Sequence, residues 1–267
     1  MYELLYIDLT SESKTDFWAY DSEYYDEIRY TPFIRETIHQ SGDFANLNKQ
    51  GFHLNISIDN NNNGIIKHIL DVENLKLKLK IHAILNLSPS RESIVLVSQI
   101  NNQLYYSCNT NTIPISGNIL IGGKHFDASK CFGVMRFFRG ITNSVKYIVW
   151  FTGNGRINGK PLGINIGQGL GNVDSLTENG VCVDGIIHKL GQVEIEKVSE
   201  FIWYLKNKRF GNEGKLMFTL LRKVEQENHF IKFTRVVGKF NGRFILDSGI
   251  EINILNLVGY MHISKND

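Results

Sequence analysis

The sequence is poor in cysteine pairs, in charge of one sign and in long hydrophobic runs. Its three cysteines, Cys108, Cys131 and Cys182, are widely spaced and form no CxxC pair, and its eight histidines are scattered. This pattern lacks the paired ligand spacing of a zinc site, and an odd number of cysteines does not suggest a disulfide framework. We therefore expect reduced, buried thiols and no bound metal.

The charge balance is nearly even, with 29 basic and 27 acidic residues and a net charge of +2. No strong field would attract nucleic acid or an anionic membrane surface. The opening "MYELLYIDLTSESK" lacks a basic, apolar secretory signal, and no apolar stretch approaches the ~20 residues that cross a bilayer. We expect a cytoplasmic protein without a nucleic-acid partner and without stable membrane insertion.

The sequence does contain the alternating pattern of apolar and polar residues that is typical of β-strands. Residues 75–87, "LKLKLKIHAILNL", alternate apolar and mostly polar side chains, which predicts a strand with one solvent-exposed face. Further short apolar runs follow at intervals of about 8 to 12 residues, separated by Gly, Asn, Asp and Ser, as in sandwiches and barrels. Residues 24–40 are a weak helix candidate interrupted by Pro32, and residues 194–205 suit a helix or a strand. We predict an all-β protein with few short helices.

Glycine-rich segments such as "GNGRING" and "GQGLGN" do not indicate a nucleotide site. Neither matches GxxxxGK[ST], and no strand-helix-strand pattern surrounds them. Tight turns and bends at barrel corners account for most of these glycines. We expect no cofactor.

The stretch "SLTENGVCVDGIIHKLG", residues 175–191, predicts a β-hairpin around an Asp-Gly turn with positive φ at both positions. The register pairs Val183 with Ile186, Val181 with His188 and Asn179 with Leu190 on one face. Glu178, Gly180, Cys182, Ile187 and Lys189 then lie on the other face.

Two polar side chains, Asn179 and His188, therefore stand on an apolar face. A buried polar group without a partner costs about 1 to 3 kcal/mol, so the two either satisfy each other or face a ligand. Arg139 and Trp150 lie in neighbouring predicted strands, and both residue types occur where a cavity orients an apolar ligand. We take Arg139, Trp150 and Asn179 as candidate ligand-binding residues.

An ordered set of motifs carries a family resemblance: "GNILIGG", "FGVMRFFRG", "VWFTGNGRINGKPLGINIG", "TENGVCVDGIIHKL", "GKLMFTLLRKV", "VVGKFNGRFILDSG" and "NLVGYMH". It resembles the bacterial family called domain of unknown function 2804, which looks akin to lipocalin-like carotenoid hydratases and tocopherol cyclase. The resemblance implies two consecutive antiparallel lipocalin-like (calycin-type) barrels or half-barrels, in residues 1–117 and 118–267. Each would enclose a small apolar molecule.

The chain departs from that family at two places. Members usually carry an acidic residue three positions before the arginine of the "RG" pair, where this chain has Arg136. They also usually begin with strands upstream of "LLYIDL", so the resemblance implies a first barrel that lacks its first strands. A homodimer is one arrangement in which a partner completes such an open barrel.

Three functions are open at this point. The first is a cofactor-free hydratase, cyclase or isomerase of an isoprenoid, polyene or lipid, with Glu178 as acid, His188 as base, Arg139 as anchor and Trp150 stacking on a cation. In the predicted register Glu178 and His188 face opposite sides unless a bulge occurs at Gly180. The second is a non-catalytic carrier or sensor of an apolar small molecule, and the third is an interaction module whose core its own side chains fill.

Overall fold

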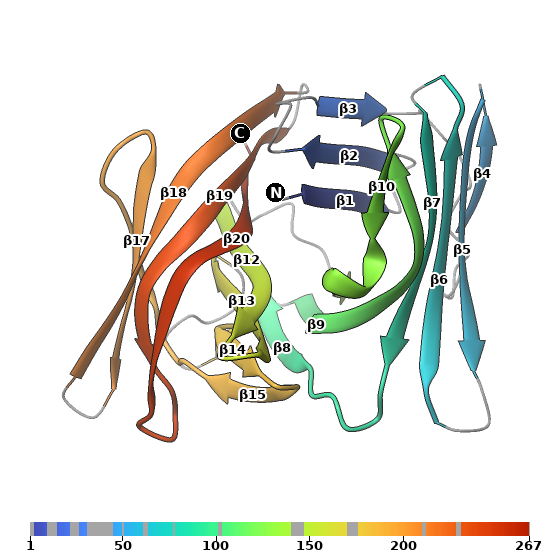
Figure 1. The fold of residues 1–267 in the computed structure, drawn as a ribbon. Coiled ribbons are helices and arrows are strands. Elements are labelled where there is room, and N and C mark those ends of the chain that lie inside the picture. The colour runs from blue at the N-terminus through green and yellow to red at the C-terminus, as the bar shows by residue number, and fades with distance from the viewer. Residues whose placement is uncertain are drawn as a thin grey trace. The chain divides into compact units, whose positions relative to one another are not determined.

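The structure is a computed structural model, and it describes residues 3–9, 15–21, 27–30, 45–49, 51–60, 64–76, 78–100, 103–139, 147–169, 176–209, 212–227 and 231–266. Antiparallel strands dominate these residues, and the one helix among them is a short 3-10 helix (Figure 1). The prediction of an all-β protein is confirmed. The chain forms two compact units, one of residues 1–89 and 113–132 and the other of residues 90–112 and 133–267.

The first unit contains two groups of strands. One is the three-stranded sheet β1-β2-β3, made of β1 (Glu3–Leu9), β2 (Thr15–Asp21) and β3 (Glu27–Tyr30). The other follows the order β10-β9-β7-β6-β5-β4. Its strands are β4 (Ala45–Lys49), β5 (Phe52–Asn60), β6 (Ile66–Asn74), β7 (Leu79–Leu87), the later part of β9 (Gln103–Ile121) and β10 (Lys124–Asp127), followed by helix η1 (Ala128–Lys130).

Two expectations for this unit need correction. The strand predicted for residues 75–87 begins only at Leu79, because a turn precedes it: Lys78 has a φ of 49° and its backbone N–H donates to the carbonyl of Leu75. Residues 27–30, inside the helix candidate 24–40, form strand β3, where β2 pairs with them. The rest of that candidate lies outside the described residues.

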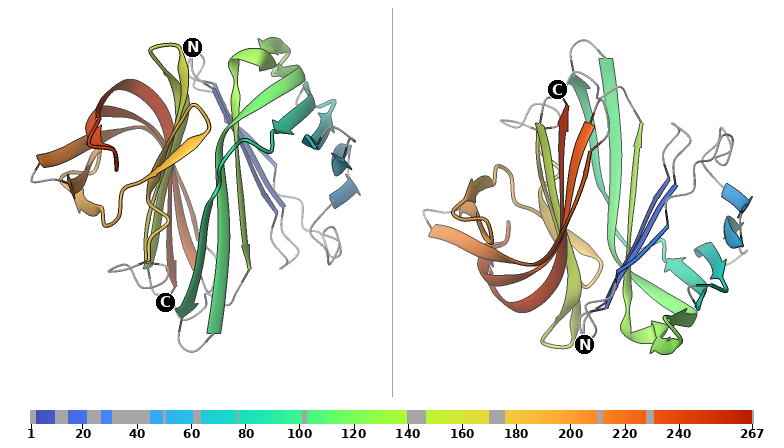
Figure 2. Two further views of the ribbon diagram at one scale, coloured as in Figure 1. Left: turned by 90° about the horizontal axis from the view of Figure 1, so that it is seen from below. Right: turned by 90° about the horizontal axis from the view of Figure 1, so that it is seen from above.

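The second unit is built on a nine-stranded sheet of order β15-β14-β13-β12-β20-β19-β18-β17-β16, which we call the curled sheet. Figure 2 shows the strong curl of these strands. They are β12 (Tyr147–Ile157), β13 (Lys160–Gln168), β14 (Gly180–Val183), β15 (Ile186–Lys189), β16 (Glu194–Lys197), β17 (Ile202–Arg209), β18 (Asn212–Glu227), β19 (Ile231–Ile245) and β20 (Glu251–Asn266). Residues 194–205 are thus mainly strand, the second of the two alternatives.

Strands β8 (Ile94–Ile100) and β11 (Phe132–Arg139) both pair with β9, whose residues 103–112 belong to the second unit. Because β9 continues into the first unit at residue 113, the chain passes between the units within one strand and returns after residue 132. This arrangement differs from the expected single boundary after residue 117. A long strand can serve two cores, which composition along the sequence does not reveal.

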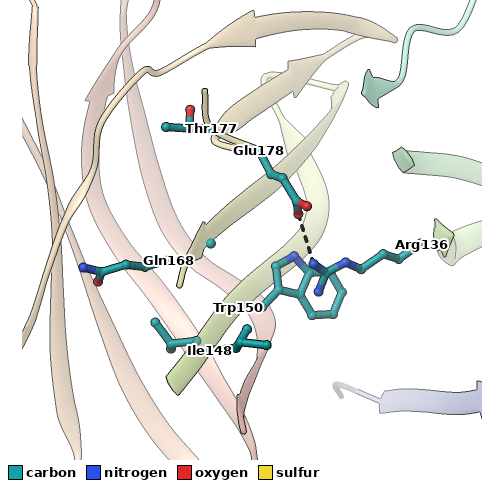
Figure 3. Close-up of a pocket in the computed structure, with 8 residues that line it drawn as sticks. Arg136, Ile148, Trp150, Gln168, Thr177 and Glu178 are labelled. Carbon is teal, nitrogen blue, oxygen red and sulfur yellow. Dashed lines mark hydrogen bonds and ion pairs between the residues drawn. The ribbon is translucent and has the colours of Figure 1, made fainter. Parts of the chain in front are cut away.

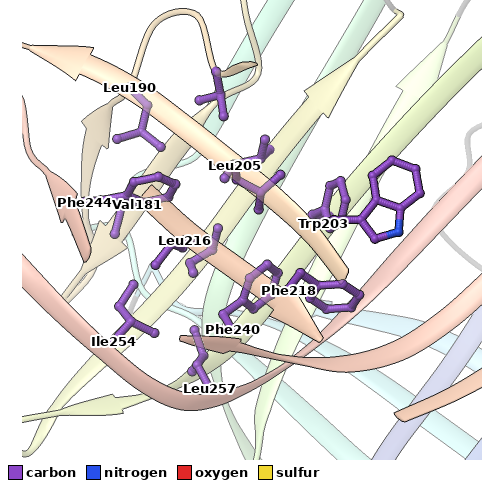
Figure 4. Close-up of a cluster of buried hydrophobic side chains, with 14 of the residues drawn as sticks. Val181, Leu190, Trp203, Leu205, Leu216, Phe218, Phe240, Phe244, Ile254 and Leu257 are labelled. Carbon is purple, nitrogen blue, oxygen red and sulfur yellow. The ribbon is translucent and has the colours of Figure 1, made fainter. Parts of the chain in front are cut away.

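The two faces of the curled sheet differ in chemistry because successive side chains alternate sides. On one face, Phe151 packs against Phe218 and Trp203, with ring centres 5.3 and 6.0 Å away, and Phe218 lies 4.8 Å from Phe240. This cluster takes residues from both ends of the sheet, which therefore curls around it (Figure 4). Side chains of the sheet itself fill this face.

We predict that Phe240→Ala lowers the free energy of unfolding by about 3 to 5 kcal/mol, because the fully buried ring leaves a cavity between Phe151 and Phe218. Leu255→Ala, on the neighbouring strand β20 and 81% exposed, should change it by no more than about 0.5 kcal/mol. Urea unfolding followed by circular dichroism measures both. Equal losses of unfolding free energy in the two variants would show that the Phe240 ring does not stabilise the core.

Candidate functional site

The hairpin forms as the sequence predicts. Asp184 and Gly185 have φ values of 55° and 88°, and the strand pairing joins Val183 with Ile186 and Val181 with His188. The backbone N–H of Leu190 donates to the carbonyl of Asn179 over 3.1 Å, which continues the predicted register. Val181 enters the apolar cluster, whereas Cys182 contacts Thr112 of β9, so the two faces of the hairpin are also as predicted.

The carboxylate of Glu178 is the centre of a buried polar cluster. Its Oε1 accepts hydrogen bonds from the hydroxyls of Tyr105, at 3.2 Å, and Ser107. Its Oε2 accepts from Asn109 Nδ2 and Arg136 Nη2, both at 3.1 Å. Tyr105, Ser107 and Asn109 are alternate residues of β9, so the strand presents all three to one side.

This set of contacts suits an ionised carboxylate. Glu178 is 5% exposed, and each of its oxygens accepts two hydrogen bonds, which replace the water that burial removes. Burial above all raises the pKa of Tyr105 to about 12; the Glu178 charge adds to the rise and the Arg136 charge opposes it. Tyr105 therefore keeps its proton at neutral pH and acts as a donor.

Arg136 lies over the ring of Trp150, with 4.6 Å between the guanidinium carbon and the ring centre, and it also pairs with Glu178 (Figure 3). The indole N–H of Trp150 donates to Asn165 Oδ1 over 2.7 Å, and Asn165 Nδ2 donates to the backbone carbonyl of Glu178 over 2.7 Å. Asn165 therefore holds both the ring and the backbone of Glu178. The guanidinium, the indole and the carboxylate form one connected unit.

His262 and Arg235 extend the cluster across the curled sheet. The strand pairing places Trp150 opposite His262, and His262 opposite Arg235, on one face. Burial lowers the pKa of His262 to about 3, and the positive charges of Arg235 and Arg136 contribute to this shift. The imidazole is therefore neutral at physiological pH and lies in a positive potential.

A cavity of about 10 Å³ lies within this arrangement, and that is the room that one water molecule requires. Its lining combines the charged pair Arg136 and Glu178 with apolar and polar neighbours, which are Ile148, Val149, Trp150, Gly167, Gln168 and Thr177 (Figure 3). The cavity therefore fits one oxygen-sized group and no long chain as it stands.

The other candidate residues whose side chains are described, His188 and Asn179, have partners outside the Glu178 cluster. His188 Nδ1 lies 2.6 Å from Asp247 Oδ1, and none of its described contacts reaches the Glu178 cluster. The pairing of Gly180 through Val183 has no register shift, so no bulge brings His188 to Glu178. Asn179 accepts from the backbone N–H of Gly167 and donates to the carbonyl of Gly191. The side chain of Arg139 lies outside the described residues.

Sequence reasoning missed most partners of Glu178. Tyr105, Ser107 and Asn109 do carry a signal, since their period of two in "QLYYSCNTNT" puts three hydrogen-bonding groups on one face of a strand. In the sequence, Arg136 stands out only as a departure from the family pattern. No local pattern in the sequence connects the three β9 residues or Arg136 to Glu178.

Metal and membrane features are absent from the part of the chain that the structure describes. There, no group of three or more His, Cys, Asp or Glu side chains is placed to hold a metal ion. No described helix is long and apolar enough to span a bilayer. All three cysteines are free thiols, but only Cys182 is buried, because Cys108 and Cys131 lie at half-exposed positions.

Fold and site together define an all-β protein with a buried, charged polar cluster in its second unit. The chain belongs to the family described as domain of unknown function (DUF2804), whose model matches residues 1–266. The match extends well beyond residues 115–265, where the motifs are clearest. No curated protein and no solved structure matches the chain.

We predict that Glu178→Gln destabilises the protein by about 3 to 5 kcal/mol, because it leaves the Arg136 charge largely buried without its counter-ion. A matched control is Glu251→Gln, which breaks the exposed 2.8 Å pair with Arg243 and should cost no more than about 1 kcal/mol. Urea unfolding midpoints report both. Similar small losses would mean that Arg136 does not depend on Glu178.

The lowered pKa of His262 makes stability depend on pH. Between about pH 6.5 and pH 3 the unfolded chain binds a proton at this residue and the folded protein does not, so acidification destabilises the fold by up to about 1.4 kcal/mol per pH unit. We expect His262→Gln to lose less stability than the wild type from pH 7 to pH 4, as measured by urea unfolding. The exposed His125→Gln should follow the wild type, and a His262→Gln curve parallel to it would contradict the assignment.

Proposed function

We propose that the protein binds a small, largely apolar molecule beside Trp150 and holds the polar end of that molecule at Arg136 and Glu178. The observation that carries the proposal is a buried ion pair on the wall of a cavity whose other walls include Ile148 and the indole ring. A buried ion pair adds little stability compared with well-packed apolar residues of similar volume, so stability alone does not account for this one. A few polar groups among apolar walls are typical of ligand sites.

The size of the cavity decides which part of the ligand enters it. About 10 Å³ accommodates one oxygen atom, so the polar end replaces a water molecule while the apolar body remains towards Ile148 and Gln168. Enclosure of more of the ligand requires side chains at the rim to move. The small polar cavity fits a carrier or sensor that holds the head group of its ligand.

Binding is favoured over proton transfer by the state of Glu178. A hydratase or cyclase of the lipocalin-like kind that the sequence resembles needs a proton donor beside an alkene. Glu178 accepts four hydrogen bonds and has no oxygen left to present a proton, and Arg136 stands where the family resemblance implies an acid. A cofactor-free hydratase, cyclase or isomerase is therefore the less supported form of the proposal.

We predict that a small apolar molecule co-purifies with the wild-type protein and appears in native mass spectrometry and in organic extracts. Trp150→Leu should lower the bound fraction about tenfold, since the ring is a cavity wall. The control is Trp203→Leu, which alters an equally buried tryptophan in the apolar cluster of the same unit and should retain the molecule.

The outcomes separate the three functions. Loss of the molecule only in Trp150→Leu supports the site, and equal loss in both variants would assign the effect to destabilisation. An empty protein that resists every apolar probe would favour an interaction module. Incubation with the extracted molecule then tests catalysis: an unchanged structure indicates a carrier, and the addition of water indicates a hydratase.

A further inference from the structure

We infer that the polar end of the ligand is an anion, a carboxylate or a phosphate on an apolar body, and that Arg136 binds it. The inference rests on the proposed function and adds the chemical class of the ligand. Four features of the cluster support it: an unused donor on Arg136, the occupied oxygens of Glu178, the arginine charges that act on His262 and the bond from Lys189 to a lining residue.

The first feature is the hydrogen-bonding state of Arg136. Its Nη2 donates to Glu178, and the plane of the guanidinium is held over Trp150. Its Nε is buried and has no hydrogen-bond partner among the described residues. A buried donor without an acceptor is unfavourable, and Arg136 lines the cavity, so an oxygen placed there would satisfy it.

The second feature is that Glu178 has nothing left to offer a ligand that donates hydrogen bonds. Tyr105 and Ser107 occupy Oε1, and Asn109 and Arg136 occupy Oε2. An ammonium group, which can only donate, would have to displace one of these donors, which would leave a buried polar group unsatisfied. A hydroxyl can accept from Arg136, but it forms a weaker bond than an anion does. An acceptor at Arg136 requires no such exchange.

The third feature is the sign of the charge around the cavity. Arg136 and Arg235 both disfavour a positive charge on His262, which stands beside Trp150 in the sheet. Both arginines therefore oppose a positive charge at His262, although Glu178 offsets the charge of Arg136 in the cavity wall, and low dielectric strengthens these effects.

The fourth feature is Lys189. Its ammonium donates to the backbone carbonyl of Thr177 over 2.5 Å, and Thr177 lines the cavity. Burial lowers the pKa of Lys189 despite the opposing effect of the Glu178 charge. A positive group thus lies one hydrogen bond away from a lining residue, and this arrangement complements an anionic head group.

The test compares four probes with the same ten-carbon chain: decanoate, decyl phosphate, decanol and decylamine. We expect isothermal titration calorimetry to show that the wild type binds at least one of the two anions about tenfold more tightly than decanol, the factor expected for one charge-assisted hydrogen bond. Decylamine should bind most weakly. The stronger of decanoate and decyl phosphate identifies which kind of anion the site suits.

Arg136→Met should remove the preference for the anions and leave the affinity for decanol within about twofold, since it deletes the donor and keeps an apolar stem. Arg156→Met is the matched control, because Arg156 is exposed on β12 and donates to the carbonyl of Gly159, which does not line the cavity. If Arg136→Met does not fold, the relative affinities of the wild type for the four probes still show whether the site prefers an anion.

The failures are distinguishable. Equal affinity for decanol and both anions would overturn the anionic head group and leave the proposed function standing. Tighter binding of decylamine would overturn it as well. Absence of binding by all four probes, together with an empty purified protein, would remove the proposed function and this inference with it.

Discussion

The organisation of the second unit depends on the buried carboxylate of Glu178. An ionised group inside a protein must be compensated, and this one takes its compensation from β9 and β11. Those strands therefore have to lie against the face of the curled sheet that carries Trp150. Asn111 of β9 continues the contact, because its Nδ2 donates to Thr152 Oγ1 and to the carbonyl of Ile164, each over 3.1 Å.

The alternation of side chains along strands lets one sheet perform two tasks. On β12, Val149 and Phe151 enter the apolar cluster that stabilises the unit, while Trp150 and Thr152 face the polar side. The apolar face is filled by rings and provides little room for a ligand. The polar face contains the small cavity and the charged pair, so the apolar core and the proposed binding site are separated by direction more than by position in the sequence.

The nature of residue 136 decides which chemistry this site supports. The family resemblance leads one to expect a carboxylic acid there, beside Glu178, and two carboxyl groups in contact would share a proton and favour acid catalysis. Arg136 instead forms an ion pair with Glu178 and stacks on Trp150. Residue 136 therefore supplies no second carboxyl group beside Glu178, and its positive charge favours the anion binding that we propose over acid catalysis.

The sequence by itself determined the all-β class, the Asp184-Gly185 turn and the faces of the hairpin, because these features depend on residues close together along the chain. It left the partners of Glu178 unknown, since Ser107 lies 71 residues before it and Arg136 lies 42 residues before it. His188 likewise meets Asp247 across 59 residues instead of meeting Asn179 or Glu178. Period and turn type specify which way a side chain points, whereas the packing of β9 and β11 on the curled sheet decides what it meets.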